Sequence, residues 1–223
     1  MIRSSTGILR CTALVLVFAV AGCASWSKTQ EGAAIGGAAG AVLGGVIGNQ
    51  AGSTATGAII GAAVGGTAGA MIGKRMDEQA ESLEEELPGA EVERVGEGIQ
   101  VTFDSGLLFD FDSYALRPEA QEHLTSLAAS LNEYPESELL IVGHTDSSGE
   151  EGYNQALSED RAEAAGNHLV RGGVLPSRVR TMGLGETEPV TSNDTEDGMQ
   201  QNRRVEVAIF ASEEYRKKIG GGS

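Results

Sequence analysis

The spacing of glycine is the feature that most constrains what this chain can fold into. Residues 32–73 carry no charged side chain and contain 14 glycines. A set of five glycines, each four residues after the previous one, occurs twice with an offset of 25 residues. The first set is Gly32, Gly36, Gly40, Gly44 and Gly48, and the second is Gly57, Gly61, Gly65, Gly69 and Gly73. Since residues four apart share one face of a helix, we predict a glycine-zipper helical hairpin over residues 32–73.

Helices this rich in glycine need stabilisation from their surroundings. Each glycine in a helix interior costs about 1 kcal/mol relative to alanine, so two such helices lose on the order of ten kcal/mol. Close approach of the two backbones, with a turn at residues 50–56, is the compensation that we expect. Each arm would be ~25 Å long, slightly short of the hydrocarbon core of a bilayer, so entry into the membrane stays open. A low-complexity Gly/Ala linker is the alternative interpretation.

The first 22 residues have the composition of a secretory signal peptide. Arg3 and Arg10 supply positive charge, and the apolar stretch at residues 12–21 is shorter than the ~20 residues of a transmembrane helix. The sequence Val20-Ala21-Gly22-Cys23 resembles the lipobox of bacterial lipoproteins. This resemblance implies that Cys23 is lipidated and that residues 23–31 form a lipid-anchored N-terminus. Cys11 would be removed with the signal peptide, which leaves no partner for an intramolecular disulfide.

The residues after the lipobox bear on localisation. Ala24 and Ser25 follow the cysteine, with no Asp at the second position. By resemblance to enterobacterial lipoproteins, this favours an outer-membrane protein facing the periplasm. The formal net charge of −16 disfavours nucleic acid and anionic lipid surfaces as partners. The alternative is that Cys23 is an ordinary cysteine beyond a simple signal peptide.

The rest of the chain predicts a linker, a domain and a tail. Residues 74–87 form an acidic amphipathic helix that ends at Pro88-Gly89, and we interpret it as a solvated spacer. A hairpin over residues 91–103 leads into the domain. We therefore expect a linker at 74–97, a domain at 98–212 and a flexible tail at 213–223.

Within this domain the apolar patterns predict strand, helix, strand, helix, strand, strand. The strands are expected at 107–111, 139–142, 179–184 and 203–210, and the helices begin at Pro118 and Asn154. The unbroken apolar run at 139–142 is typical of a strand covered on both faces. The predicted fold class is α+β, a two-layer domain with a mixed sheet and helices on one side.

Five ordered blocks of this domain resemble the OmpA-like peptidoglycan-associated family. They are Phe109-Asp110-Phe111-Asp112, Gly143-His144-Thr145-Asp146, Asn154 with Leu157-Ser158 and Arg161-Ala162, Gly183-Leu184-Gly185, and Asn202-Arg203-Arg204-Val205-Glu206. The resemblance covers about residues 98–212. It implies non-covalent binding to peptidoglycan, chiefly to the diaminopimelate of the stem peptide. Met199 departs from the family, in which an arginine is usual at this place.

One pair of opposite charges is expected to bind the ligand. Asp146 follows a buried strand, so it should lie at the carboxyl edge of the sheet, where open α/β sheets bind ligands. Arg161 comes seven residues after Asn154, which returns it to nearly the same helical face. A zwitterionic amino-acid terminus could place its ammonium on Asp146 and its carboxylate in the fork of Arg161. The alternative is that Asp146 and Arg161 form an ion pair with each other.

The family resemblance adds further site residues. They are Asp110, Thr145, Ser148, Asn154 and Arg203. Arg203 and Arg204 alternate across a strand, so at most one of them should face the pocket and the other should be a solvated charge. For His144 we expect a packing or hydrogen-bonding role.

Other classes of function are weaker interpretations. No serine or cysteine has the setting of a nucleophile, and three scattered histidines supply no zinc triad. We therefore expect neither catalysis, nor a metal, nor a cofactor. A membrane-active glycine zipper, or an envelope module regulated by a protein partner, remains the alternative. Inner-membrane stator proteins share the domain but lack a cleaved lipobox.

Overall fold

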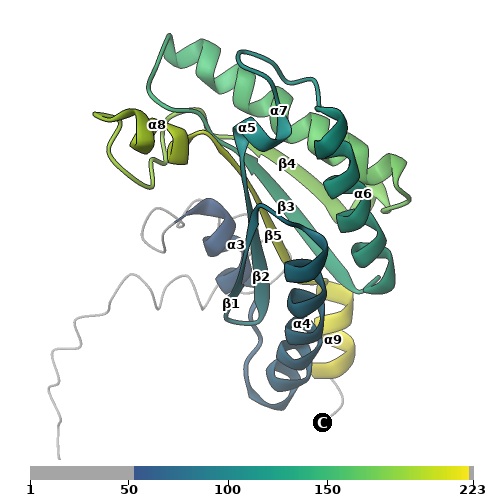
Figure 1. Cartoon of the computed structure of the whole chain (residues 1–223). Coiled ribbons are helices and arrows are strands. Elements are labelled where there is room, and N and C mark those ends of the chain that lie inside the picture. The colour runs from purple at the N-terminus through teal and green to yellow at the C-terminus, as the bar shows by residue number, and fades with distance from the viewer. Residues whose placement is uncertain (1–52, 221–223) are drawn as a thin grey trace, which may run out of the picture.

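A single mixed sheet organises the computed structural model, which describes residues 53–220 (Figure 1). The strands are β1 (Ala90–Val95), β2 (Gly98–Asp104), β3 (Ser137–Gly143), β4 (Val179–Gly183) and β5 (Arg204–Ala211). The helices are α3 (Thr54–Ala62), α4 (Gly66–Glu86), α5 (Ser105–Leu108), α6 (Pro118–Glu133), α7 (Glu151–Arg171), α8 (Glu196–Asn202) and α9 (Glu213–Gly220), with a short 3-10 helix at Pro176–Arg178. The strand order is β1-β2-β5-β3-β4, in which only the β3–β4 pair is parallel.

The main core lies on one face of this sheet. Side chains alternate along a strand, so Val101 and Phe103 of β2, Ile141 of β3 and Val207 of β5 point to the same side and are fully buried. Helices α4, α6 and α7 cover this face. The predicted α+β class with a mixed sheet is confirmed.

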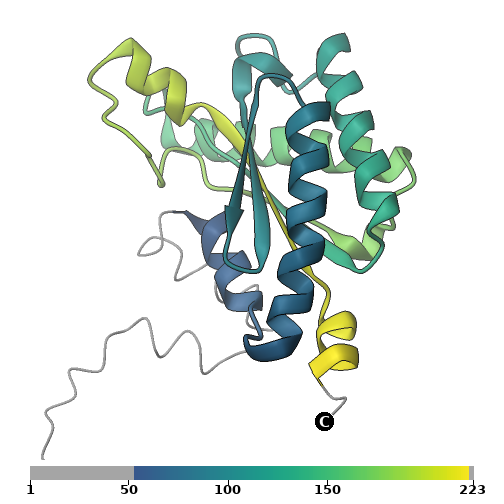
Figure 2. The same cartoon turned by 60° about the horizontal axis from the view of Figure 1, so that its bottom comes forward.

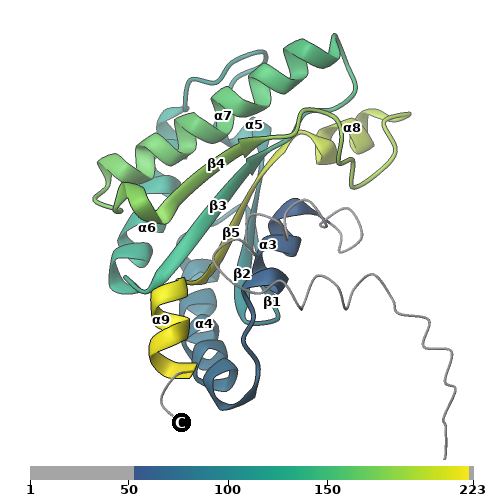
Figure 3. The same ribbon diagram turned by 180° about the vertical axis from the view of Figure 1, so that it is seen from behind.

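The opposite face is covered by α3, as the view from behind shows (Figure 3). Ala55, Ala58 and Ile59 of this helix are fully buried. They pack in one cluster with Val142 of β3 and Phe210 of β5. The expectation of helices on one side therefore holds for α4, α6 and α7, and a helix of the glycine-rich segment covers the second apolar face that the run at 139–142 predicted.

The second set of glycines does not form one continuous helix. α3 ends at Ala62, and α4 begins at Gly66. Gly65 and Gly66 have φ values of 68° and 64°, which glycine adopts readily and other residues rarely do. The carboxylate of Glu97 accepts hydrogen bonds from the Val64 and Gly65 amides at 2.8 and 2.7 Å. The predicted helical arm over 57–73 is therefore wrong at this break, and the first glycine set and Cys23 lie outside the described residues.

The acidic stretch at 74–87 is not a solvated spacer. It belongs to α4, whose Ile72, Met76, Ala80 and Leu83 are buried in the main core. The acidic residues occupy the outer face of an amphipathic helix, which is why composition alone suggested a solvated segment. Among residues 53–220, no helix is both long and apolar enough to cross a bilayer.

The tail is also more ordered than expected. α9 lies beside the first turns of α4 (Figure 2). Its Tyr215 and Ile219 pack against the main core, and Arg216 is buried. A flexible tail is therefore wrong for residues 213–220, because two apolar side chains on one face of α9 attach it to the domain.

The strand predicted at 107–111 is wrong. Asp104 accepts a 2.6 Å hydrogen bond from the Gly106 amide and starts the short helix α5. Leu108, the last residue of α5, and Phe109, which follows it, are both buried in the main core. The hairpin predicted at 91–103 instead supplies the first two strands of the sheet.

Helix α7 packs on β3 and β4 at backbone distance. A Cβ atom at Gly143 would lie 2.2 Å from the carbonyl oxygen of Ser158, and one at Gly183 would lie 2.3 Å from the amide nitrogen of Glu159. We expect Gly143→Ala and Gly183→Ala each to lower the free energy of unfolding by about 1–3 kcal/mol or more, because helix and strands must move apart. Urea unfolding measures this. Gly152→Ala in α7 is the control and should not destabilise the protein, because a Cβ atom there would meet no atom of another segment within 4 Å. Unchanged unfolding midpoints for both strand variants would contradict the close packing.

Candidate functional site

The candidate site lies where the loop after β3 meets the end of β4 and the start of β5. The His144 amide donates a 2.9 Å hydrogen bond to the carbonyl of Arg204, and the Thr145 amide donates one of 2.9 Å to the carbonyl of Gly185. These bonds attach the loop to both neighbouring strands. Asp146 is thereby held at the carboxyl edge of β3, as its position after a buried strand predicted.

The carboxylate of Asp146 is held in place by two donors. Arg203 donates from Nη1 to Oδ2, and the Ser148 amide donates to Oδ1 at 2.8 Å. The side chain is only 8% exposed. Burial alone would raise the pKa of Asp146, but the hydrogen bonds from Arg203 and Ser148 outweigh it and hold the pKa below its ordinary value. The carboxylate is therefore ionised at neutral pH.

Arg161 projects from α7 beside the loop that precedes α6. Its Nε donates a 2.9 Å hydrogen bond to the carbonyl of Ser113, and its guanidinium lies 5.3 Å from the centre of the Phe109 ring. These contacts orient the fork. Within residues 53–220, Nη1 and Nη2 of Arg161 have no hydrogen-bond partner and no carboxylate within 4.0 Å. Burial lowers the pKa of Arg161, and the neighbouring Tyr153 and Asp112 oppose this shift.

The two charges are near each other but do not pair. Both Asp146 and Arg203 are close enough to influence the pKa of Arg161. Asp146, however, forms its ion pair with Arg203, which also donates to Glu196 at 2.9 Å. The alternative that Asp146 and Arg161 merely neutralise each other is therefore wrong. The site combines an ionised carboxylate with a guanidinium whose two terminal nitrogens are unbonded to the described protein.

Asn154 joins the loop to the first turn of α7. Its Nδ2 donates to the carbonyls of Asp146 at 3.2 Å and Ser148 at 3.1 Å, and to the carboxylate of Glu186 at 2.7 Å. The side chain is buried, and these bonds of Nδ2 fix the loop. Asn154 thus positions the backbone around Asp146.

The remaining predicted residues differ in their surroundings. Thr145 is buried, and its hydroxyl has no protein partner in the described part of the chain. The Ser148 hydroxyl lies 3.6 Å from the sulfur of Met199, the position that departs from the family pattern. The side chain of Asp110 is 80% exposed and lies 3.7 Å from Arg117. Within residues 53–220, Asp110 therefore contacts Arg117 and not the Asp146 cluster.

The prediction that the second arginine of the Arg203-Arg204 pair is solvated is wrong. Arg204 is 4% exposed and donates to Glu206 at 2.7 Å and to the carbonyl of Glu188 at 3.1 Å. His144 lies 3.9 Å from Glu206, and burial together with the charge of Arg204 lowers its pKa, so the ring is neutral. Opposite charges two residues apart in a strand share one face, and this spacing was the available signal for the buried pair.

The sequence analysis assigned no site role to Asp112, whose charge acts on Arg161, or to Phe111 next to it. Asp112 has a φ of 56°, the one positive value among the described non-glycine residues, and accepts a hydrogen bond from the Tyr153 hydroxyl. Such backbone conformations concentrate at functional sites because the surrounding structure must enforce them. Phe111, next to Asp112, is 97% exposed. An exposed aromatic between two aspartates was the signal in the sequence.

The described residues contain no group of three or more His, Cys, Asp or Glu side chains that could hold a metal ion. What they offer at this edge is a set of fixed opposite charges. Such a set can bind a molecule that presents an ammonium and a carboxylate close together.

Acid should remove the stabilisation that ionised Asp146 provides. Its folded pKa lies below the unfolded one, so the stabilisation is complete above the unfolded value, about pH 4, and is lost as pH falls through the folded value. We expect the gap in free energy of unfolding between wild type and Asp146→Asn to narrow below about pH 4. Urea unfolding at a series of pH values measures it. A gap that stays constant down to low pH would show that Asp146 is not held ionised.

Comparison with known proteins agrees with this architecture. Residues 108–203 match the OmpA family, and residues 3–77 match the YMGG-like Gly-zipper family. The probable lipoprotein YiaD of Escherichia coli (strain K12) is 38% identical over 136 residues, which cover 60% of this chain and 62% of YiaD. The peptidoglycan-binding protein ArfA of Mycobacterium bovis is 38% identical over 103 residues, which cover 46% of this chain and 32% of ArfA.

A solved structure supports the same relationship. The cell wall anchor of the T6SS from Pseudomonas aeruginosa superposes with a TM-score of 0.55 at 29% identity, over 60% of this chain and 97% of that one. The matched region spans less than two thirds of both curated relatives, YiaD and ArfA. The chain therefore contains an OmpA-family domain that follows a segment of the YMGG-like glycine-zipper family.

Proposed function

We propose that this chain binds peptidoglycan non-covalently and recognises the free amino-acid end of diaminopimelate in the stem peptide. The observation that supports this most is the guanidinium of Arg161, whose terminal nitrogens have no partner within residues 53–220, near the ionised Asp146. ArfA is a peptidoglycan-binding protein by name, and the matched solved structure is described as a cell wall anchor. Both relationships favour a wall ligand over other zwitterions.

The chemistry of binding follows from the two charges. The ligand carboxylate accepts two hydrogen bonds from Nη1 and Nη2 of Arg161, the bidentate geometry that a guanidinium favours. The ligand ammonium donates to Asp146, because a carboxylate has about four acceptor positions and the protein uses two. Arg203 keeps Asp146 ionised, while Asn154 and Ser148 hold the loop around it. Thr145 and, at the rim, Asp110 complete the proposed site.

Two kinds of cell wall test this proposal. Lysine equals diaminopimelate without the terminal carboxylate, so a lysine-type wall lacks the group that Arg161 would bind. We expect the full chain to sediment with purified diaminopimelate-type sacculi and to stay in solution with lysine-type sacculi at the same mass. Equal sedimentation with both would rule out recognition of the carboxylate.

The anchoring part of the proposal concerns Cys23. We infer that its lipid fixes the chain in the outer membrane, so that wall binding tethers this membrane to the cell wall. Two or three acyl chains give stable anchoring, whereas one chain alone is marginal. Labelled palmitate should be incorporated by the wild type and not by Cys23→Ser. Incorporation into both would refute lipidation at this residue.

A further inference from the structure

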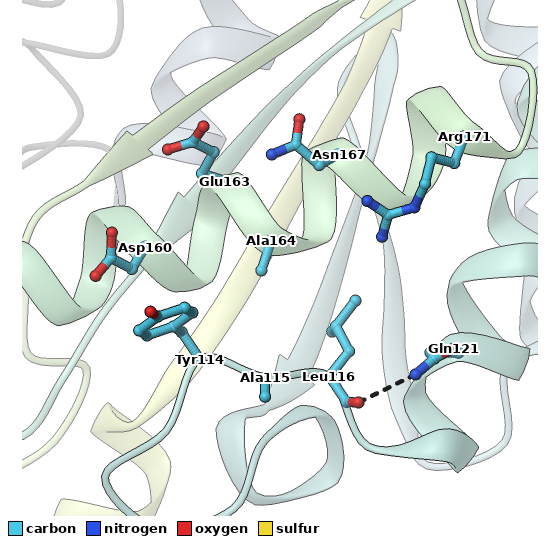
Figure 4. Close-up of a pocket in the computed structure, with 9 residues that line it drawn as sticks. All are labelled: Tyr114, Ala115, Leu116, Gln121, Asp160, Glu163, Ala164, Asn167 and Arg171. Carbon is cyan, nitrogen blue, oxygen red and sulfur yellow. Dashed lines mark hydrogen bonds between the residues drawn. The ribbon is translucent and has the colours of Figure 1, made fainter.

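A groove lies next to Asp146 and Arg161, the charge pair of the proposed site. This groove, of about 480 Å³, lies between α7 and the segment at 114–116 that leads into α6 (Figure 4). Neither Asp146 nor Arg161 lines it. Tyr114, however, follows Ser113, whose carbonyl accepts the hydrogen bond from Arg161, and Asp160 precedes Arg161 on α7. The groove and the charge pair are thus neighbours that share one loop and one helix.

Exposed aromatic side chains gather in this region. Three aromatic residues stand among the large apolar side chains exposed within residues 53–220, namely Phe111, Tyr114 and Tyr153. Phe111 lies in this loop and Tyr153 donates a hydrogen bond to Asp112 of the same loop, whereas Tyr114, 57% exposed, lines the groove. Leaving such side chains exposed to water is unfavourable without a partner surface, and aromatic residues are enriched at recognition sites. Their grouping around one loop indicates a ligand that extends past the charge pair.

The groove lining is suited to a neutral, hydroxyl-rich ligand. Tyr114 lies at the Asp160 end, and the guanidinium of Arg171 points into the space at the other end (Figure 4). Asp160 and Glu163 can accept hydrogen bonds from hydroxyl groups, and Asn167 and Arg171 can donate them. A second anion would be opposed by the two carboxylates. A sugar ring instead offers C–H groups to an aromatic face and hydroxyls to planar polar side chains.

We propose that this groove binds the amino-sugar glycan to which the stem peptide is attached, an inference that rests on the proposed function. From Asp160 to Arg171 the helix runs roughly 16 Å at 1.5 Å per residue, so the surface is long relative to one sugar ring. Once the peptide end occupies the charge pair, the covalently linked sugars are held at high local concentration over the adjoining surface. Weak contacts along α7 then add to the affinity of the whole muropeptide.

Two soluble probes separate the sites. One is the diaminopimelate-containing stem tripeptide, and the other is the same tripeptide attached to its GlcNAc–MurNAc disaccharide. We expect the full chain in detergent to bind the disaccharide-peptide about five- to tenfold more tightly than the free peptide by calorimetry. Tyr114→Ala and Asn167→Ala should remove most of that advantage and leave the affinity for the free peptide unchanged. Leu175→Ala, which alters an exposed side chain outside the groove, is the matched control.

The outcomes distinguish this inference from the proposed function. If the wild type binds both probes equally and the two groove variants have no effect, the glycan site is wrong while peptide recognition stands. If the wild type binds neither probe, the proposed function itself fails. Asn167 lies on the surface of α7, away from the Ser113 carbonyl, so its variant tests the groove even if Tyr114→Ala disturbs the loop.

Discussion

Replacing Arg161 with alanine is expected to weaken binding to diaminopimelate-type sacculi by about 2–5 kcal/mol, which is between about 30-fold and several thousand-fold in affinity. The reason is the state of its guanidinium. Nε is fixed by the carbonyl of Ser113, and the terminal nitrogens have no partner in the described protein. The variant removes the proposed partner of the ligand carboxylate. A sacculus-binding isotherm measures the loss.

Two further arginine variants make this result specific. Arg161→Lys keeps the positive charge but not the bidentate fork, so we expect it to recover only part of the lost affinity. Arg180→Ala removes an arginine of β4 that lies 3.7 Å from Glu138, and it should bind like the wild type. Wild-type binding by a correctly folded Arg161→Ala protein would refute the role of this residue.

The largest expected loss of stability comes from Glu206→Ala. Glu206 and Arg204 form an ion pair whose side chains are 2% and 4% exposed. Removing the carboxylate leaves the guanidinium charge buried without its partner, a change that destabilises by about 3–5 kcal/mol. Urea unfolding should show this decrease.

Replacing both residues of the pair tests whether the unpaired buried charge causes the loss of stability. Arg204→Met with Glu206→Leu removes both charges, so the double variant should be far closer to the wild type than either single variant. Glu138→Ala breaks the more exposed pair with Arg180 and should change stability by less than about 1 kcal/mol. A Glu206→Ala protein as stable as the wild type would show that Arg204 is compensated by its backbone partners alone.

Periodicity predicted the elements whose apolar pattern is unambiguous. β3, α6, α7, β4 and β5 all occur within a few residues of their predicted positions. The segment at 107–111 failed because a short apolar run is compatible with either a strand or a buried helical turn. The helix at 74–87 was predicted correctly, but its interpretation as a solvated spacer was wrong for another reason. Its apolar stripe is visible in the sequence, but the surface against which it packs is formed by residues far along the chain.

The same limit applies to the candidate site. The motif blocks identified Asp146, Arg161 and Arg203, and the structure places these three charges near one another. Spacing along the chain could not tell which arginine pairs with Asp146, because the pairing depends on how the end of β5 meets the loop after β3. The sequence analysis also predicted wrongly that Arg204 is solvated. An arginine in a strand is solvated unless a carboxylate such as Glu206 lies on the same buried face.

The most direct test of the account measures how Arg161 and the ligand carboxylate depend on each other. Calorimetry would compare a stem tripeptide ending in diaminopimelate with one ending in lysine, for wild type and for Arg161→Ala. The account predicts a preference of roughly 30-fold or more for diaminopimelate in the wild type, and a preference within about threefold in the variant. An equal preference in both proteins would contradict it, because the carboxylate would then be recognised by some other group.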